Sequence, residues 1–286
     1  RYIKRFLKNK KHFNELILNG EYYLFEVLEE LDRYRLPPEF ALLPYVESNY
    51  DPFSISSSGA VGLWQLMPTT GKIYNLEKTW WVEERHDPIE STKAAVKYLA
   101  YLYNRFDRNP TLTLIAYNAG PTYLEKQIRL LENRGREVTL RNLKLSKESF
   151  NYVPKFLAIN KIIKNPYKYG VNLPNIPNQK VIDKIQIKGQ VEMLPFSEFT
   201  GVTPEFLYQL NAGYITKNNQ PLFLTQSSGA QLSANNDNPL NIGSVYQNIG
   251  SHYNTSNGRF TAPVAGIYWF YCAWTPQGNY LSLIHI

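Results

Sequence analysis

The stretch "HDPIESTKAAVKYLAYLYNRF", residues 86–106, decides the fold of the first part of the chain. Asp87 is placed to cap a helix, Pro88 occupies its first position and Glu90 can complete a capping box. The apolar side chains recur at helical spacing, at Ala95, Tyr98, Leu99, Leu102 and Phe106. The segment therefore predicts a long helix with one buried face.

Helical patterns continue on both sides of this stretch. Residues 24–31 carry leucine and valine at positions i, i+3, i+4 and i+7, and "TLTLIAYNAG" predicts a short buried helix that stops at Gly120. Pro121 opens the next helix, and "SFNYVPKFLAINKIIKN" is a further one. We therefore predict that residues 1–175 form one all-helical domain, so that the protein is mainly α.

The composition changes after that domain. "NLPNIPNQ" is a linker, a strand pattern follows in "KVIDKIQIKG", and two helical pieces lie in "MLPFSEFTG" and "TPEFLYQLN". From about residue 221 the chain loses charge and gains Ser, Asn, Gly and Thr, with strand signals in "GRFTAPVAGIYWFYCAW". The expected boundaries are a linker and small α/β segment over 176–220 and an all-β segment over 221–286.

Charge and chemistry-bearing residues narrow the partners. The net charge of +7 suits an anionic polymer, but no nucleic-acid motif accompanies it, so nucleic acid is not expected. A single cysteine, Cys272, excludes an internal disulfide, and four histidines show no ligand spacing. We expect no metal and no cofactor. No apolar run reaches the ~20 residues of a membrane-spanning helix.

A lone carboxylate stands out in "LLPYVESNYDP", residues 42–52. If Leu43 and Val46 face the core, Glu47 lies four residues from Leu43 and is carried toward the same face. Burial penalises the charged form, so the pKa of Glu47 should rise toward neutrality, which suits a general acid. The alternative is a solvated glutamate or a structural hydrogen-bond partner.

Several spaced motifs carry a family resemblance. "ALLPYVESNYDPFSISSSGAVGLWQLMP", "WWVEERHDPIESTKAAVKYLAYLYNRF", "LTLIAYNAGP" and "YVPKFLAINKIIKNPYKYG" together resemble the membrane-bound lytic murein transglycosylase D family, with its soluble lytic transglycosylase domain. The resemblance covers about residues 1–213. It implies a lysozyme-like fold for residues 1–175 and cleavage of peptidoglycan between N-acetylmuramic acid and N-acetylglucosamine.

The resemblance also implies a set of site residues. The catalytic acid of the family matches Glu47, and a serine that hydrogen-bonds near it matches Ser56. The implied substrate-binding positions that line the sugar cleft or face the acid across it are Gln65, Met67, Tyr117 and Asn118.

The expected mechanism follows from the lack of a convincing second carboxylate. A two-carboxylate glycosidase needs a partner about 5–9 Å away, but Asp51 precedes a proline as a turn residue and Asp87 caps a helix. This favours a substrate-assisted route in which Glu47 acts as acid and then as base, closing a 1,6-anhydro ring. A hydrolytic lysozyme using Asp51 or bound water, and a non-catalytic glycan-binding or adhesion module, remain the alternatives.

The remaining segments resemble other modules. Residues 181–213 weakly resemble a degenerate lysin motif, with a structural tail as the alternative. "NIGSHYNTSNGRFTAPVAGIYWFYCAW" resembles the first half of a complement-type, TNF-like jelly-roll head, which would trimerise if it were complete. Unpaired edges predict aggregation or disorder, and "SLIHI" resembles translated sequencing-adapter DNA, so we expect an assembly artefact at the join or the end.

The resemblance places the protein in the bacterial cell envelope, in the periplasm or associated with the outer membrane. Its expected partner is the glycan strand of peptidoglycan. Membrane anchoring would require a segment outside this sequence.

Overall fold

The computed structural model describes residues 1–79, 82–182 and 193–211, together with six short β-strands beyond residue 222. The chain forms two compact units, Arg1–Ile215 and Thr216–Ile286. Each unit is described by itself.

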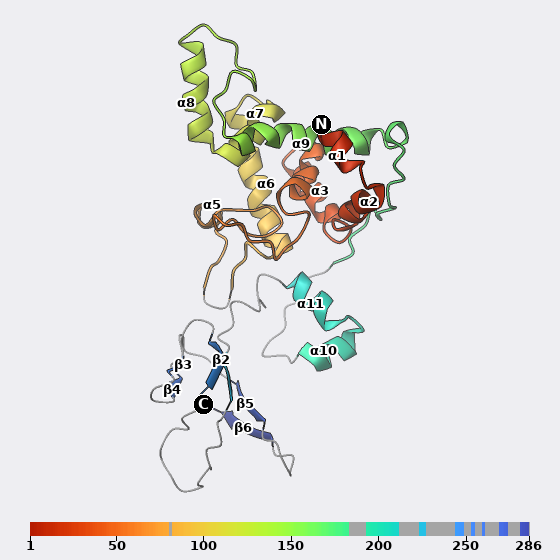
Figure 1. Cartoon of the computed structure of the whole chain (residues 1–286), viewed down its shortest axis with the longest axis vertical. Helices are drawn as coiled ribbons and strands as arrows, with labels where there is room; N and C mark the ends of the chain where they lie inside the picture. Colours follow the sequence, from red (N-terminus) through yellow and green to blue (C-terminus); the bar gives the residue numbers. More distant parts are fainter. Residues whose placement is uncertain are drawn as a thin grey trace. The chain divides into compact units, whose positions relative to one another are not determined.

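Helices build the first unit, as Figure 1 shows. The prediction of a mainly helical protein is confirmed. In chain order the helices are α1 (Tyr2–Phe6), α2 (Lys10–Leu18), α3 (Leu24–Arg33), the 3-10 helix η1 (Pro38–Leu42), α4 (Leu43–Glu47), α5 (Pro68–Ile73), α6 (Pro88–Arg105), α7 (Pro110–Ala119), α8 (Pro121–Glu132), α9 (Lys147–Lys164), the 3-10 helix η2 (Tyr167–Tyr169), α10 (Met193–Thr200) and α11 (Pro204–Leu210).

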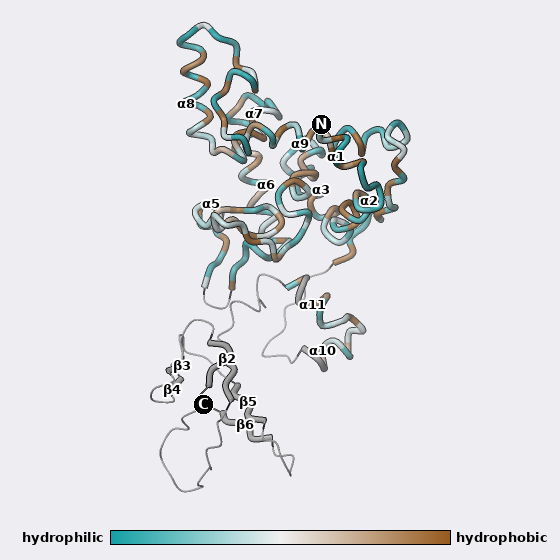
Figure 2. Tube along the Cα trace, viewed as in Figure 1, coloured by the Kyte–Doolittle hydropathy of each residue, from teal (hydrophilic) through white to brown (hydrophobic). Residues whose placement is uncertain are grey.

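The central helix α6 follows the prediction closely. The carboxylate of Asp87 accepts hydrogen bonds from the backbone N–H groups of Ile89 at 2.8 Å and Glu90 at 2.9 Å, which caps the helix. Leu99 and Leu102 are completely buried on its inner face. The hydropathy colouring of Figure 2 shows teal and brown residues alternating along the helices, as expected for elements with one face toward a shared core.

The chain turns sharply after α7 and returns through α9. Gly120 ends α7 with φ +88°, a conformation that favours glycine, and Pro121 opens α8 as predicted. Helix α9 then packs against α7, α1 and α4. This return brings residues near position 150 beside the short helix that ends in Glu47.

The two predicted helical pieces after the linker are confirmed as α10 and α11. The hydroxyl of Thr203 caps α11, and the ring of Phe206 lies 4.6 Å from that of Tyr22, measured between centroids. The predicted strand at 180–189 lies mostly outside the described residues.

The strands of the second unit pair as three antiparallel two-stranded sheets: β1 with β2, β3 with β4, and β5 with β6. Strands β4 and β5 fall within the stretch predicted as strand, and the jelly-roll arrangement stays a prediction. Their bounds are β1 (Phe223–Gln226), β2 (Ser244–Asn248), β3 (Tyr253–Asn254), β4 (Arg259–Phe260), β5 (Trp269–Ala273) and β6 (Leu281–His285).

None of the helices in the described part of the chain combines the length and the apolar character that crossing a membrane requires.

Candidate active site

Glu47 is the last residue of α4, where the chain leaves the helix abruptly. Leu43 and Val46 are buried, with 0% and 7% of their surface exposed, so the prediction that they face the core is confirmed. Asn49 and Tyr50 follow with φ of +58° and +61°, left-handed conformations that end the helix. The side chain of Glu47 is thus held at the end of an apolar helix rather than displayed along a solvated one.

Helix α9 supplies two direct contacts to this helix end. The hydroxyl of Tyr152 donates a hydrogen bond to Oε1 of Glu47, and Tyr152 itself is buried. The ammonium of Lys155 donates to the backbone carbonyl of Val46 at 2.6 Å. One turn of α9 therefore holds both the carboxyl of Glu47 and the main chain immediately before it.

The electrostatic environment of Glu47 favours its neutral form. Burial raises the pKa of Glu47 to about 7, although the hydrogen bond from Tyr152 and the charge of Lys155 lower it; the charge of Glu148 raises it further. The predicted rise of the pKa toward neutrality is therefore supported by the structure. At neutral pH a comparable fraction of the carboxyl is protonated and ionised, the condition in which one group can both give and accept a proton.

Tyr117 lies on the same side of the fold, near the end of α7. Its hydroxyl donates to the carbonyl of Trp64 at 2.7 Å, which ties α7 to the segment that follows Glu47. Burial and then the charge of Glu47 raise the pKa of Tyr117 well above its usual value, so the two groups are electrostatic neighbours. Asn118, the next residue, is half-buried.

Gln65 and Met67 lie on an irregular segment between α4 and α5. Gln65 has φ +48°, and its side-chain amide donates to the carbonyls of Ser54 at 3.1 Å and Gly62 at 3.0 Å. The amide nitrogen is therefore committed to shaping the segment. Met67 immediately precedes α5 and is 41% exposed.

Ser56 is used within its own turn. Its hydroxyl accepts a hydrogen bond from the backbone N–H of Ala60 at 2.9 Å and lies 3.0 Å from the hydroxyl of Ser58. Among the described residues, no hydrogen bond joins Ser56 to Glu47. The role expected for Ser56 near the acid stays a prediction.

A buried arginine braces the segment that carries Gln65. Arg85 pairs with Glu83 through two hydrogen bonds of 2.7 and 2.8 Å, and its third nitrogen donates to the carbonyls of Gly59 and Leu66, both at 2.9 Å. Both charged side chains are at least nine-tenths buried. Two of the four bonds from this guanidinium hold the backbone on either side of Gln65, and the other two hold its partner Glu83.

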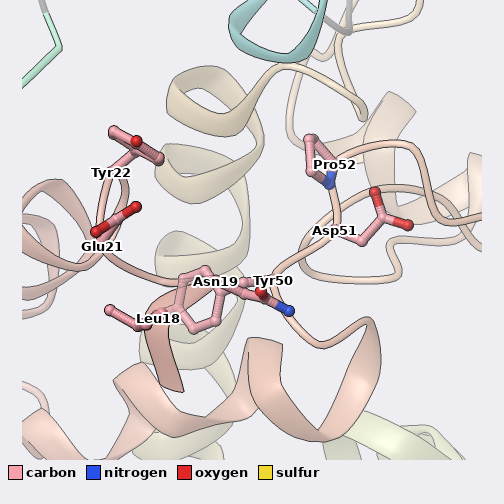
Figure 3. A pocket seen from close by; sticks show the side chains of 7 residues that line it. All are labelled: Leu18, Asn19, Glu21, Tyr22, Tyr50, Asp51 and Pro52. Carbon is pink, nitrogen blue, oxygen red and sulfur yellow. The ribbon is translucent and has the colours of Figure 1, made fainter. Parts of the chain in front are cut away.

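Asp51 occupies a different position from Glu47. Its carboxylate accepts the backbone N–H of Phe53 at 2.9 Å, which confirms its predicted role as a turn residue. It also lines a cavity of about 320 Å³ between the α2–α3 connection and the segment after α4. Figure 3 shows the seven lining side chains, and none of the predicted site residues is among them.

No group of three His, Cys, Asp or Glu side chains is arranged to hold a metal ion in the part of the chain that the structure describes.

Sequence reasoning missed Tyr152 and Lys155, which no local pattern connects to Glu47. One signal was available: Pro154 stands between them, inside α9. A proline in a helix interior costs about 3 kcal/mol, so its presence marks a segment that tertiary packing holds in place.

Comparisons with known families agree with the two-part division of the chain. Residues 27–139 match the family described as "Transglycosylase SLT domain", and residues 223–285 match the family described as "C1q domain". The first match contains Glu47, Ser56 and the four positions expected to line the sugar cleft or face the acid.

Two individual relatives match long stretches of the chain. "Membrane-bound lytic murein transglycosylase D" of Escherichia coli (strain K12) is 34% identical over 210 residues, which cover 73% of this chain and 46% of that protein. A protein of Alteromonas sp. (strain M-1) named for tributyltin chloride resistance is 30% identical over 163 residues, covering 57% of this chain and 78% of that protein. The chain thus spans about half the length of the first of these relatives.

Among solved structures, the 70-kDa soluble lytic transglycosylase Slt70 of Escherichia coli matches with a TM-score of 0.40 and 25% identity, over 50% of this chain and 24% of that chain. From the sequence matches, the chain belongs to the lytic transglycosylase family.

Proposed function

We propose that this protein is a peptidoglycan lytic transglycosylase that cleaves the bond between N-acetylmuramic acid and N-acetylglucosamine and leaves a 1,6-anhydromuramic acid end. The observation that supports it most is the half-buried carboxyl of Glu47 at the end of α4, with a pKa raised to about 7 and a hydrogen bond from Tyr152. The transglycosylase names of the relatives favour the same activity.

In the first step, the protonated carboxyl of Glu47 gives its proton to the glycosidic oxygen. The bond from the anomeric carbon to that oxygen breaks, and the N-acetylglucosamine side leaves with a new hydroxyl. The carbonyl oxygen of the neighbouring N-acetyl group stabilises the cationic anomeric carbon. The scheme needs no second carboxylate of the protein. This agrees with the position of Asp51, whose carboxylate accepts a hydrogen bond within its own turn.

In the second step, Glu47 is a carboxylate and takes the proton of the 6-hydroxyl of the muramic acid. The oxygen released by this proton transfer bonds to the anomeric carbon and closes the 1,6-anhydro ring. Glu47 ends protonated, as it began, and no water is consumed. A pKa near 7 serves both steps, because the protonated and the ionised forms of Glu47 are both populated near neutral pH.

Five further residues are proposed to contact the glycan. Tyr117 offers an aromatic face with its hydroxyl fixed on Trp64, and the exposed Met67 offers an adaptable apolar contact. The remaining three proposed contacts are Ser56, Gln65 and Asn118. Since the amide nitrogen of Gln65 is committed to the backbone, its carbonyl oxygen is the atom left to accept a sugar hydroxyl.

The decisive experiment is mass spectrometry of the muropeptides released from purified sacculi. The wild-type protein should release products lighter by a water molecule than ordinary reducing ends, and Glu47→Gln should release none. Glu29→Gln is the matched control, because Glu29 is an exposed glutamate of α3. Wild-type activity in Glu47→Gln would refute the assignment.

Other outcomes separate the alternatives. Ordinary reducing ends would identify a hydrolase, and Glu148 would then be the carboxylate to replace first, since its charge acts on Glu47. Sedimentation with sacculi without any release would identify a glycan-binding module.

We also propose the wider context. Residues 1–175 are the catalytic domain, 176–220 a linker with a lysin-motif-like segment, and 221–286 a TNF-like jelly-roll segment. Activity on peptidoglycan would place the protein in the bacterial cell envelope, and the net charge of +7 suits an anionic wall polymer. Fractionation of the expressing bacterium tests this location.

A further inference from the structure

The end of α4 has a carbonyl that no helix bond can satisfy. Helix ends leave their last carbonyls without intrahelical partners, and α4 is only five residues long. The carbonyl of Pro44 accepts the N–H of Ser48, while that of Val46 accepts the ammonium of Lys155 at 2.6 Å. A charged donor from another helix thus caps the residue immediately before Glu47.

The groups of α9 that act on Glu47 share one face of the helix. Glu148, Tyr152 and Lys155 are spaced at i, i+4 and i+7, which places them on the same side of a helix. Tyr152 bonds to the carboxyl of Glu47, and Lys155 bonds to the main chain of the preceding residue. The side chain and the backbone of the proposed acid are therefore held by the same rigid element.

We propose that Lys155 is a positioning residue that caps α4 and stabilises the ionised form of Glu47 between the two steps of the proposed reaction. This inference rests on the proposed function. After the first step, the new carboxylate lies in an environment where burial disfavours charge, and the half-buried ammonium of Lys155 offsets that penalty. No proton moves to or from Lys155 in either step.

Among the described groups whose charge acts on Glu47, the ammonium of Lys155 is the cation that stabilises its ionised form. Glu148, on α9, has the opposite effect on Glu47, and the hydroxyls of Tyr117 on α7 and Tyr152 on α9 carry no charge because burial raises their pKa well above the usual value. Arg5 of α1 acts on Lys155, lowering its pKa in addition to the larger effect of burial.

The competing explanation is a purely structural cap. A cap alone predicts that Lys155→Met lowers stability without changing how Glu47 titrates. The two explanations therefore separate on the titration of Glu47 and not on activity, which a poorly positioned carboxyl would also lose.

The test compares Lys155→Met and Lys155→Arg, with Lys161→Met as the control because Lys161 is exposed on the same helix. The carboxyl of Glu47 is titrated by NMR in protein labelled with ¹³C-glutamate, with Glu47→Gln identifying its signal. In Lys155→Met the midpoint should move to higher pH by about one unit, as expected for the loss of a nearby opposite charge. Lys155→Arg should restore most of the shift.

The rate of anhydro-product release should fall about tenfold in Lys155→Met, and the basic limb of its pH profile should move in the same direction as the titration. An unchanged midpoint, with or without a lower melting temperature, would overturn the proposal and leave Lys155 a structural cap. Because the titration needs no turnover, a wild-type protein that releases no anhydro ends would refute the proposed function separately.

Discussion

Glu47→Gln should make the protein more stable above neutral pH while leaving its stability at pH 4 nearly unchanged. In the folded protein, burial raises the pKa of Glu47 from the ordinary 4.5 to about 7. Between these values the folded state keeps a proton that the unfolded state has released, so wild-type stability falls as the pH rises. Glutamine has the shape of the protonated acid, can still accept the hydrogen bond of Tyr152, and never ionises.

The magnitude follows from the two pKa values. Each pH unit between 4.5 and about 7 corresponds to ~1.4 kcal/mol, so ionisation of Glu47 costs the folded state roughly 3 kcal/mol by pH 8. Against a total stability of ~5–15 kcal/mol, this is a large share for one side chain. Glu47→Gln removes that cost, and the gain should be complete only above about pH 8.

Urea unfolding of wild type, Glu47→Gln and the exposed control Glu29→Gln, followed by circular dichroism from pH 4 to 8.5, measures the effect. The difference between Glu47→Gln and wild type should grow from nearly zero to roughly 3 kcal/mol, and the control should show no such growth. A difference that is constant across this range would mean that Glu47 titrates normally in the fold, and the basis of the proposed acid–base role would be lost.

Three further substitutions probe the segment that carries Gln65. Gly59 and Gly62 have φ of +83° and +79°, but a Cβ at Gly59 would meet nothing within 4 Å, whereas one at Gly62 would lie 2.0 Å from the carbonyl oxygen of Arg85. Gly59→Ala should cost ~1 kcal/mol of backbone strain and Gly62→Ala at least ~2 kcal/mol more, and equal melting temperatures would refute the clash. Arg85→Met should cost about 3 kcal/mol in urea unfolding by leaving the buried Glu83 with Lys78 alone; a loss below ~1 kcal/mol would show that the segment does not depend on this brace.

Local patterns predicted the elements of the helical unit well, because their determinants are close in sequence. The cap at Asp87 and the stop at Gly120 depend on residues within one turn, and both formed as predicted. The apolar surroundings of Glu47 were also predictable, since the buried Leu43 and Val46 lie within the same helix.

The surroundings of Glu47 were not predictable in this way. Tyr152 is 105 residues away, and no periodicity in a single sequence shows which face of α9 meets which end of α4. The case of Ser56 is the converse: a family position suggested a contact, while the bonds to Ala60 and Ser58 come from the local conformation of the turn. Long-range packing decides the first and local hydrogen bonding the second.

The arrangement around Glu47 explains why one carboxyl could serve two opposite roles. Burial alone would keep the carboxyl protonated and would make the transfer of its proton to the glycosidic oxygen costly, because that transfer creates a buried charge. The bond from Tyr152 and the charge of Lys155 both favour the ionised form, and together they limit the rise of the pKa to about 7. If burial and these two contacts set the balance, then weakening either contact should raise the pKa of Glu47 further, and the first proton transfer, which creates the carboxylate, should become slow rather than the second.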